Sequence, residues 1–122
     1  MSNGVNISGC KITDNIFTDR RNGVYQVARL IELAKELEPF DVPLRCLCIS
    51  TPIFDPIENA RWLADHVKRV NETNLDYPVI MDADGMIMDG WHRVVKALVE
   101  GRETIKAVRF EKTPSPDYYK QD

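Results

Sequence analysis

The sequence predicts a small α/β (α+β) domain in which about three helices pack on a small mixed sheet. Its 122 residues are 43% hydrophobic and 29% charged, which suits one domain that buries about two thirds of its unfolded surface. Segments with helical periodicity alternate with short apolar runs, in the order helix, strand, helix, hairpin, helix, strand. This composition argues against a coiled coil, a collagen or a disordered tail.

The first helix is expected over residues 22–38, where apolar side chains recur at steps of three and four. Pro39 ends it. The mostly apolar segment 42–50 predicts a strand buried on both faces. Cys46 and Cys48 would then share a face. Core packing explains them better than zinc, because a zinc site needs about four ligands and no others lie nearby.

The second helix is expected over residues 55–70. The run Asp55-Pro56-Ile57-Glu58 is a strong start, because the aspartate can cap the first N–H groups and proline fits the first helical position. Trp62 and His66, four residues apart, should meet on one stripe. For His66 itself, a plain surface or boundary position is the favoured interpretation. The expected inner face consists of Ile57, Ala60, Leu63, Ala64, Val67 and Val70.

A hairpin is expected next, with strands over 77–81 and 86–88 joined by the turn Asp82-Ala83-Asp84-Gly85. Asp82, Asp84 and Asp89 lie close together in the sequence and suggest a divalent metal at first sight. Turns favour aspartate for ordinary conformational reasons, and the pattern of a calcium loop is missing. We therefore expect no metal site.

The last helix is expected over 91–100, ending at Gly101, and the last strand over 105–110, where apolar and basic residues alternate. These elements divide the chain into three parts. Residues 1–41 form an N-terminal extension whose amphipathic helix packs on the domain, residues 42–112 form the domain, and residues 113–122 form a flexible tail rich in proline and polar residues.

The charge and the cysteine content limit which partners and which cellular location we expect. Sixteen Lys and Arg against nineteen Asp and Glu give a net charge of −3, so a nucleic-acid partner would need a local basic patch. No apolar run approaches the roughly 20 residues that span a bilayer, and the N-terminus lacks a signal pattern. Three sparse cysteines argue against a disulfide framework. We expect a cytoplasmic protein without a membrane partner.

The most informative stretch lies where the hairpin ends and the last helix begins. Gly90 allows a close backbone approach, and the unpaired N–H groups of a helix start attract anions. His92 and Arg93 add donors in the first turn, where acidic residues are the usual choice. A structural alternative explains the pattern about equally well: Asp89 caps the helix and pairs with the two basic residues. Trp91 is either a core anchor or a stacking platform.

The run Asp89-Gly90-Trp91-His92-Arg93, between YPVIMDADGMIM and VKALVEGRETIKAVRF, resembles the motif region of the ParB N-terminal and sulfiredoxin superfamily. The resemblance covers roughly residues 42–110. It implies a small α/β domain whose Gly90, His92 and Arg93 hold the phosphates of a nucleotide, ATP, ADP or CTP, together with Mg²⁺. Trp91 stands where sulfiredoxins have their nucleophilic cysteine, which argues against sulfiredoxin activity.

The resemblance also places the preceding helix beside the nucleotide. Sulfiredoxins present Lys, Ser and Thr from this helix, and the resemblance aligns these positions with Asn59, Trp62 and His66. Arg61 is nearby and keeps a positive charge in this region. ParB proteins carry an acidic residue in the motif that this chain lacks. An anion site is therefore expected, with the identity of the nucleotide left open.

Three functions follow as hypotheses. The first is a stand-alone domain that binds a nucleotide or other phosphate ligand at Gly90, Trp91, His92 and Arg93, supported by Asp89, Asn59, Arg61 and His66; nucleotide hydrolysis or phosphotransfer is a further possibility without an assigned catalytic residue. The second is a DNA-associated ParB-like module or weak nuclease of phage or plasmid type. The third is a ligand-free structural or interaction protein. The basic patch of the second hypothesis consists of Arg93, Lys96, Arg102, Lys106, Arg109 and Lys112.

Overall fold

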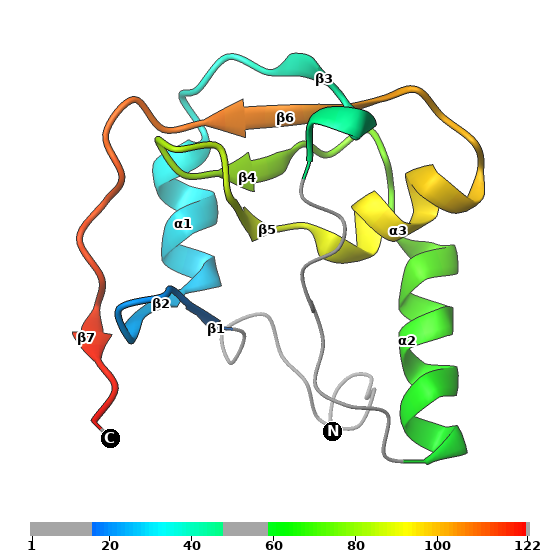
Figure 1. Cartoon of the computed structure of the whole chain (residues 1–122), viewed down its shortest axis with the longest axis horizontal. Coiled ribbons are helices and arrows are strands. Elements are labelled where there is room, and N and C mark those ends of the chain that lie inside the picture. Colours follow the sequence, from blue (N-terminus) through cyan, green and yellow to red (C-terminus); the bar gives the residue numbers. More distant parts are fainter. Residues whose placement is uncertain (1–15, 48–58, 122) are drawn as a thin grey trace.

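In the computed structural model, which describes residues 16–47 and 59–121, a mixed four-stranded sheet forms the centre of the fold (Figure 1). Its strand order is β3-β6-β4-β5. β6 runs antiparallel to β3 and parallel to β4, and β4 and β5 form an antiparallel hairpin. The α+β class with a small mixed sheet is thereby confirmed. The strands are β3 (Phe40–Pro43), β4 (Val79–Met81), β5 (Ile87–Asp89) and β6 (Thr104–Arg109).

A second, smaller sheet joins the two ends of the described chain. Its strands, in the order β1-β2-β7, are antiparallel. They comprise β1 (Ile16–Thr18), β2 (Gly23–Gln26) and β7 (Tyr118–Tyr119). The helices are α1 (Val27–Ala34), the 3₁₀ turn η2 (Leu44–Cys46), α2 (Ala60–Glu72) and α3 (Trp91–Val99).

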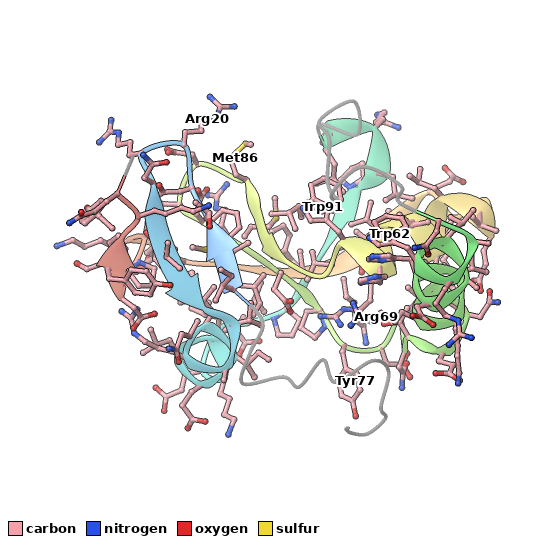
Figure 2. All side chains as sticks on the ribbon, turned by 90° about the horizontal axis from the view of Figure 1, so that it is seen from below. Arg20, Trp62, Arg69, Tyr77, Met86 and Trp91 are labelled. Atoms are coloured by element: carbon pink, nitrogen blue, oxygen red, sulfur yellow. The ribbon has the colours of Figure 1, made fainter. Side chains whose placement is uncertain are left out.

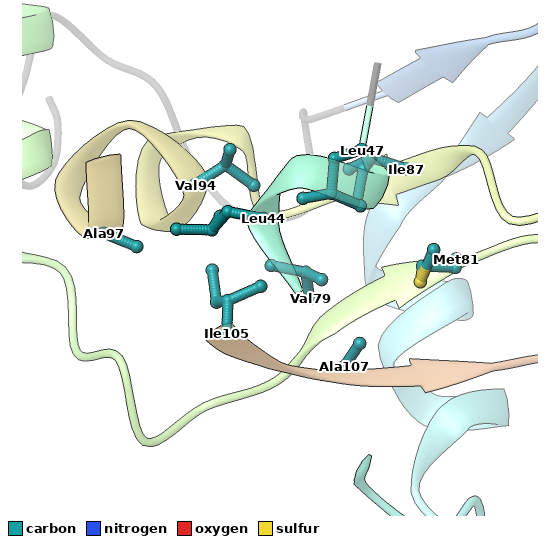
Figure 3. Close-up of a cluster of buried hydrophobic side chains, with 9 residues drawn as sticks. All are labelled: Leu44, Leu47, Val79, Met81, Ile87, Val94, Ala97, Ile105 and Ala107. Carbon is teal, nitrogen blue, oxygen red and sulfur yellow. The ribbon is translucent and has the colours of Figure 1, made fainter. Parts of the chain in front are cut away.

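Successive side chains of each strand point to opposite faces of the central sheet, so a hydrophobic cluster forms on each face. Val79 and Met81 of β4 pack on one side with η2 and α3, whereas Ile80 between them packs on the other side with α1. Each fully buried aliphatic side chain stabilises the fold by roughly 1.5–3 kcal/mol. The first cluster (Figure 3) consists of Leu44, Leu47, Val79, Met81, Ile87, Val94, Ala97, Ile105 and Ala107.

The hairpin, the last helix and the last strand are where the sequence predicts them. One carboxylate oxygen of Asp82 accepts hydrogen bonds from the backbone N–H groups of Asp84 and Met86, which closes the turn. The left-handed φ of 72° at Gly101 follows the end of α3. Local turn and cap chemistry is therefore sufficient to define this part of the fold.

The first helix is shorter than its periodicity predicts. Residues 23–26, expected to be helical, form β2, because β1 and β7 supply hydrogen-bonding partners on both sides. The strand expected over 42–50 is also wrong in its length. β3 ends at Pro43, which has no N–H to donate, and the chain turns into η2, where Cys46 is exposed rather than packed in the core. Cys48 lies outside the described residues.

α2 begins at Ala60, with Asn59 as its N-cap. The expected start at 55–58 lies outside the described residues. Most of the predicted inner face is exposed: Leu63 and Val67 are 44% and 49% exposed, and of its described members only Val70 is half-buried. The half-buried stripe instead carries Trp62, Asp65, His66, Arg69 and Val70. α2 turns this more polar stripe toward the protein because it packs beside α3 rather than on the sheet (Figure 1).

The segment after β6, expected to be loose, is held by hydrogen bonds to the smaller sheet. Asp117 donates its N–H to Val24 O, and its side chain accepts from the N–H of Gln26 and pairs with Arg29. β7 then adds a third strand to this sheet. Within residues 16–47 and 59–121, no helix has the length and apolar character needed to cross a bilayer.

Candidate functional site

A groove with a volume of about 1240 Å³ lies between the smaller sheet and the junction of β5 with α3. One wall carries Arg20 and Arg21 from the β1–β2 turn, and the other carries Trp91 and His92. Arg69 reaches the groove from α2. In Figure 2, Arg20 and Met86 lie on one side and Trp91, Trp62 and Arg69 on the other. The start of α3, where the sequence predicts a site, therefore lines this groove.

Gly90 is the N-cap of α3 and sets the direction of its first turn. Its φ of 113° is a conformation that side-chain-bearing residues rarely adopt. A Cβ at this position would lie 2.6 Å from Cγ1 of Val79, so the backbone approaches the buried strand closely. Among the described residues, no side chain at the N-cap position caps the helix, and its first turn holds no acidic residue. The carboxylate of Asp89, directly before the helix, accepts a hydrogen bond from the N–H of Gly90 and offsets part of the positive end of the helix dipole.

Arg93, predicted as a phosphate ligand, is turned away from the groove. Its Nη2 lies 3.2 Å from Oδ2 of Asp89 and 3.4 Å from the carbonyl oxygen of Pro78. The side chain is 18% exposed and does not line the groove. Burial raises the pKa of Asp89 despite the opposing effect of Arg93. The structure therefore gives Arg93 the structural role that the sequence left open for it, paired with Asp89.

His92 and His66 lie in contact, one from each of two helices. Nδ1 of His66 is 3.0 Å from Nε2 of His92, within hydrogen-bond distance. Trp62 packs on the other side of His66, with ring centroids 4.1 Å apart, as the i, i+4 spacing predicts. His66 is half-buried, so it occupies a boundary position, and it also contacts His92. The structure brings it, through His92, to the edge of the groove.

The pKa of His92 is lowered to about 4, first by burial and then by the positive charges of Arg69, His66 and Arg93. At neutral pH the ring is therefore neutral. A neutral imidazole still donates one hydrogen bond and accepts another. His92 consequently offers the groove a polar ring rather than the cation that its sequence position suggests.

Arg69 is the cation that sequence reasoning missed. It is half-buried, it lines the groove, and it lies close enough to His92 to lower the pKa of that ring. Among the described residues no carboxylate lies within ion-pair distance of its guanidinium. The signal was its spacing, three residues after His66 and seven after Trp62, which puts all three on one helix stripe.

The other supporting residues of the prediction lie away from the groove. Asn59 accepts a hydrogen bond from the N–H of Trp62 at 2.9 Å, so its side chain caps α2. Arg61 is exposed in the first turn of α2 and does not line the groove. In the part of the chain that the structure describes, no three His, Cys, Asp or Glu side chains are grouped as metal ligands would be.

The basic patch that the DNA hypothesis relies on is partly engaged in internal contacts. Lys96 donates to the carbonyl oxygens of Asn71 and Thr73 at the C-terminal end of α2, and Arg102 pairs with Glu100. Arg93 pairs with Asp89. The exposed remainder consists of Lys106, Arg109 and Lys112.

No protein-family model, curated protein or solved structure matches the chain. The resemblance to the ParB and sulfiredoxin superfamily therefore stays a prediction, based on the motif around Gly90 and on the order of the elements expected over residues 42–110. At one wall of the groove, the start of α3, Arg69 and the neutral ring of His92 offer hydrogen-bond donors. The lining also includes Arg20, Arg21 and the four aspartates Asp19, Asp82, Asp84 and Asp89.

Proposed function

We propose that the chain binds a phosphate-bearing small molecule, such as ATP, ADP or CTP, in the groove beside the start of α3. The observation that carries the proposal is Arg69, a half-buried arginine without a carboxylate partner in the described residues, which lines the groove next to His92. A phosphate oxygen between them would accept hydrogen bonds from the first N–H groups of α3 and from the guanidinium.

The charges around the helix start support a phosphate rather than a cationic ligand. Asp89 lies at the groove, but its charge is already matched by Arg93 at 3.2 Å. Among the described residues no carboxylate pairs with Arg69 in this way, and the first turn of α3 contains no acidic residue. Arg20 and Arg21 on the opposite wall offer further positive charge to a ligand with several phosphates, although Asp19, Asp82 and Asp84 lie beside them.

The rest of the proposal follows from the sequence. A cytoplasmic location, expected from the cysteine content, would expose the groove to free nucleotides. Mg²⁺ would arrive bound to the nucleotide phosphates, as it does in many phosphate-binding sites, rather than in a cage of protein ligands.

Calorimetric titration with ATP, ADP, CTP and pyrophosphate, with and without Mg²⁺, tests the proposal. We expect at least one of these ligands to bind and Arg69→Ala to weaken that binding about 10- to 100-fold, the range for loss of a charge-assisted hydrogen bond. Arg61→Ala removes the same charge from the exposed side of the same helix and is the matched control. The proposal fails if none of the ligands binds, or if both variants bind like the wild type.

The ion pair between Arg93 and Asp89 favours a second candidate, a domain that has kept its fold without a ligand. It withdraws the motif's arginine from the groove. The same titration separates the two candidates, because a ligand-free domain binds none of the four compounds. Arg93→Ala is not informative for this purpose, since it removes the partner of a half-buried carboxylate and affects folding.

A further inference from the structure

The contact between His66 and His92 is an edge-to-edge hydrogen bond. Their planes are inclined by only 10°, and their centroids are 5.2 Å apart while the two facing nitrogens are 3.0 Å apart. The centroid separation exceeds the nitrogen separation by close to twice the distance from an imidazole centroid to its own ring nitrogen. The two nitrogens therefore point at each other nearly in the ring planes. A hydrogen bond of this type needs one N–H donor and one bare nitrogen.

This geometry limits how many protons the pair can hold. When both rings are neutral, one facing nitrogen carries a proton and the other accepts. When one ring is protonated, the bond persists and becomes charge-assisted. When both rings are protonated, two N–H groups and two positive charges face each other at 3.0 Å, and the contact breaks. The pair can therefore take up one proton, but not two, without opening.

The surroundings oppose even the first proton in the ligand-free protein. Burial of the ring is the largest opposing effect on His92, and Arg69 on α2 and Arg93 on α3 add positive charge near it. Asp89 on β5 offsets Arg93, with which it pairs, and Asp65 precedes His66 on α2. Arg69 lines the groove, and no carboxylate among the described residues lies within ion-pair distance of it. An anion bound beside it would cancel this repulsion and favour a charged imidazole.

We infer that the His66–His92 pair takes up one proton when an anion binds in the groove, so that anion affinity increases as the pH falls. This inference rests on the proposed function, whose anion it uses. Linkage requires the reverse effect as well: protonation of the pair must strengthen anion binding by the same factor that the anion strengthens protonation. With one proton involved, the affinity changes by at most about tenfold per pH unit.

The two rings are the only histidines in the chain, so their NMR signals need no assignment among others. The experiment uses the full chain with ¹⁵N-labelled histidine and follows the ring nitrogens from pH 4.5 to 8. Sulfate is the probe, because it does not titrate in this range, and sodium chloride of equal ionic strength is the reference. We expect sulfate to raise the apparent pKa of the pair by about one unit and to bind more tightly at lower pH.

His66→Gln supplies the matched variant, because glutamine can hydrogen-bond to His92 but cannot take up a proton. In this variant, the change in sulfate affinity between pH 4.5 and pH 8 should be at least threefold smaller than in the wild type. Sulfate binding at the α3 amides without any change in ring titration overturns the inference and leaves the proposed function standing. Two rings that titrate independently near their ordinary pKa in the sulfate-free protein also overturn it. If sulfate, phosphate and nucleotides all fail to bind, both proposals fall.

Discussion

Gly90 and Val79 are in direct backbone-to-side-chain contact at the point where the hairpin leads into α3. Val79 is fully buried in the central sheet, and a Cβ on residue 90 would lie 2.6 Å from its Cγ1 and 3.1 Å from its Cα. The second distance involves backbone, which cannot move without shifting β4. The same glycine has a φ of 113°. One residue therefore couples the position of the site to the core.

Gly90→Ala should destabilise the fold by about 3 kcal/mol, because left-handed strain and overpacking against Val79 add. Gly101→Ala is the matched control: its φ is 72°, but nothing lies within 4 Å of the added Cβ. It should cost only about 1 kcal/mol, the strain alone. Urea unfolding of both variants measures the difference. Equal losses would show that the contact with Val79 is unimportant.

The pair of Asp89 and Arg93 should behave as a buried ion pair in a double-mutant cycle. Asp89→Ala leaves the guanidinium without its carboxylate and should destabilise by about 3 kcal/mol. Arg93→Met keeps the length of the side chain and should cost less, because Asp89 already resists ionisation through burial. The double variant should recover part of the loss. Strict additivity of the unfolding free energies would contradict a direct interaction.

Stability should fall as the pH is lowered from about 6.5 to about 4, because His92 has a pKa of about 4 in the fold against 6.5 as its ordinary value. Over this interval the unfolded chain binds more protons than the folded one, so protonation favours unfolding. Allowing for the solvent exposure of the ring, the loss should reach about 2 kcal/mol.

Asp89 acts in the opposite direction. Its pKa is raised in the fold, so its contribution to the stability of the fold increases as the pH falls toward 3.8, the ordinary pKa of the group. His92→Gln isolates the histidine, since the variant should show a flatter stability profile between pH 6.5 and 4. Thermal melts at half-unit pH steps provide the comparison. A profile that is as steep in His92→Gln as in the wild type would assign the acid sensitivity elsewhere.

The segment after β6 should contribute measurably to stability. Truncation after Lys112 removes the hydrogen bond from the Tyr25 hydroxyl to Pro114 O, the pairing of Arg29 with Asp117, and β7. We expect a loss of about 2–3 kcal/mol from these contacts together. Truncation after Lys120 keeps all of them and serves as the control. Identical unfolding midpoints for the two truncations would mean that the segment is only loosely held in solution.

Local signals predicted the second half of the fold well. The Asp82 turn, the glycine that precedes α3 and the alternation of β6 each depend on neighbours in the sequence, so the hairpin, helix and strand were readable. The boundaries of α1 and β3 could not be predicted from local signals. Residues 23–26 had helical periodicity, but their hydrogen bonds go to β1 and to β7, and β7 is more than 90 residues away in the chain.

The sequence alone determined that a helix opens after Gly90 and that basic residues occupy its first turn. Only the tertiary structure decided which of them faces the groove: Arg93 turns to Asp89, and His92 lines the groove. From another helix, Arg69 reaches the groove and His66 contacts His92. The physical reason is that periodicity identifies the faces of a helix without choosing among them. That choice depends on what the neighbouring helix presents, and α3 presented His92 to α2, so the aromatic and charged stripe of α2 packed inward and its aliphatic stripe stayed exposed.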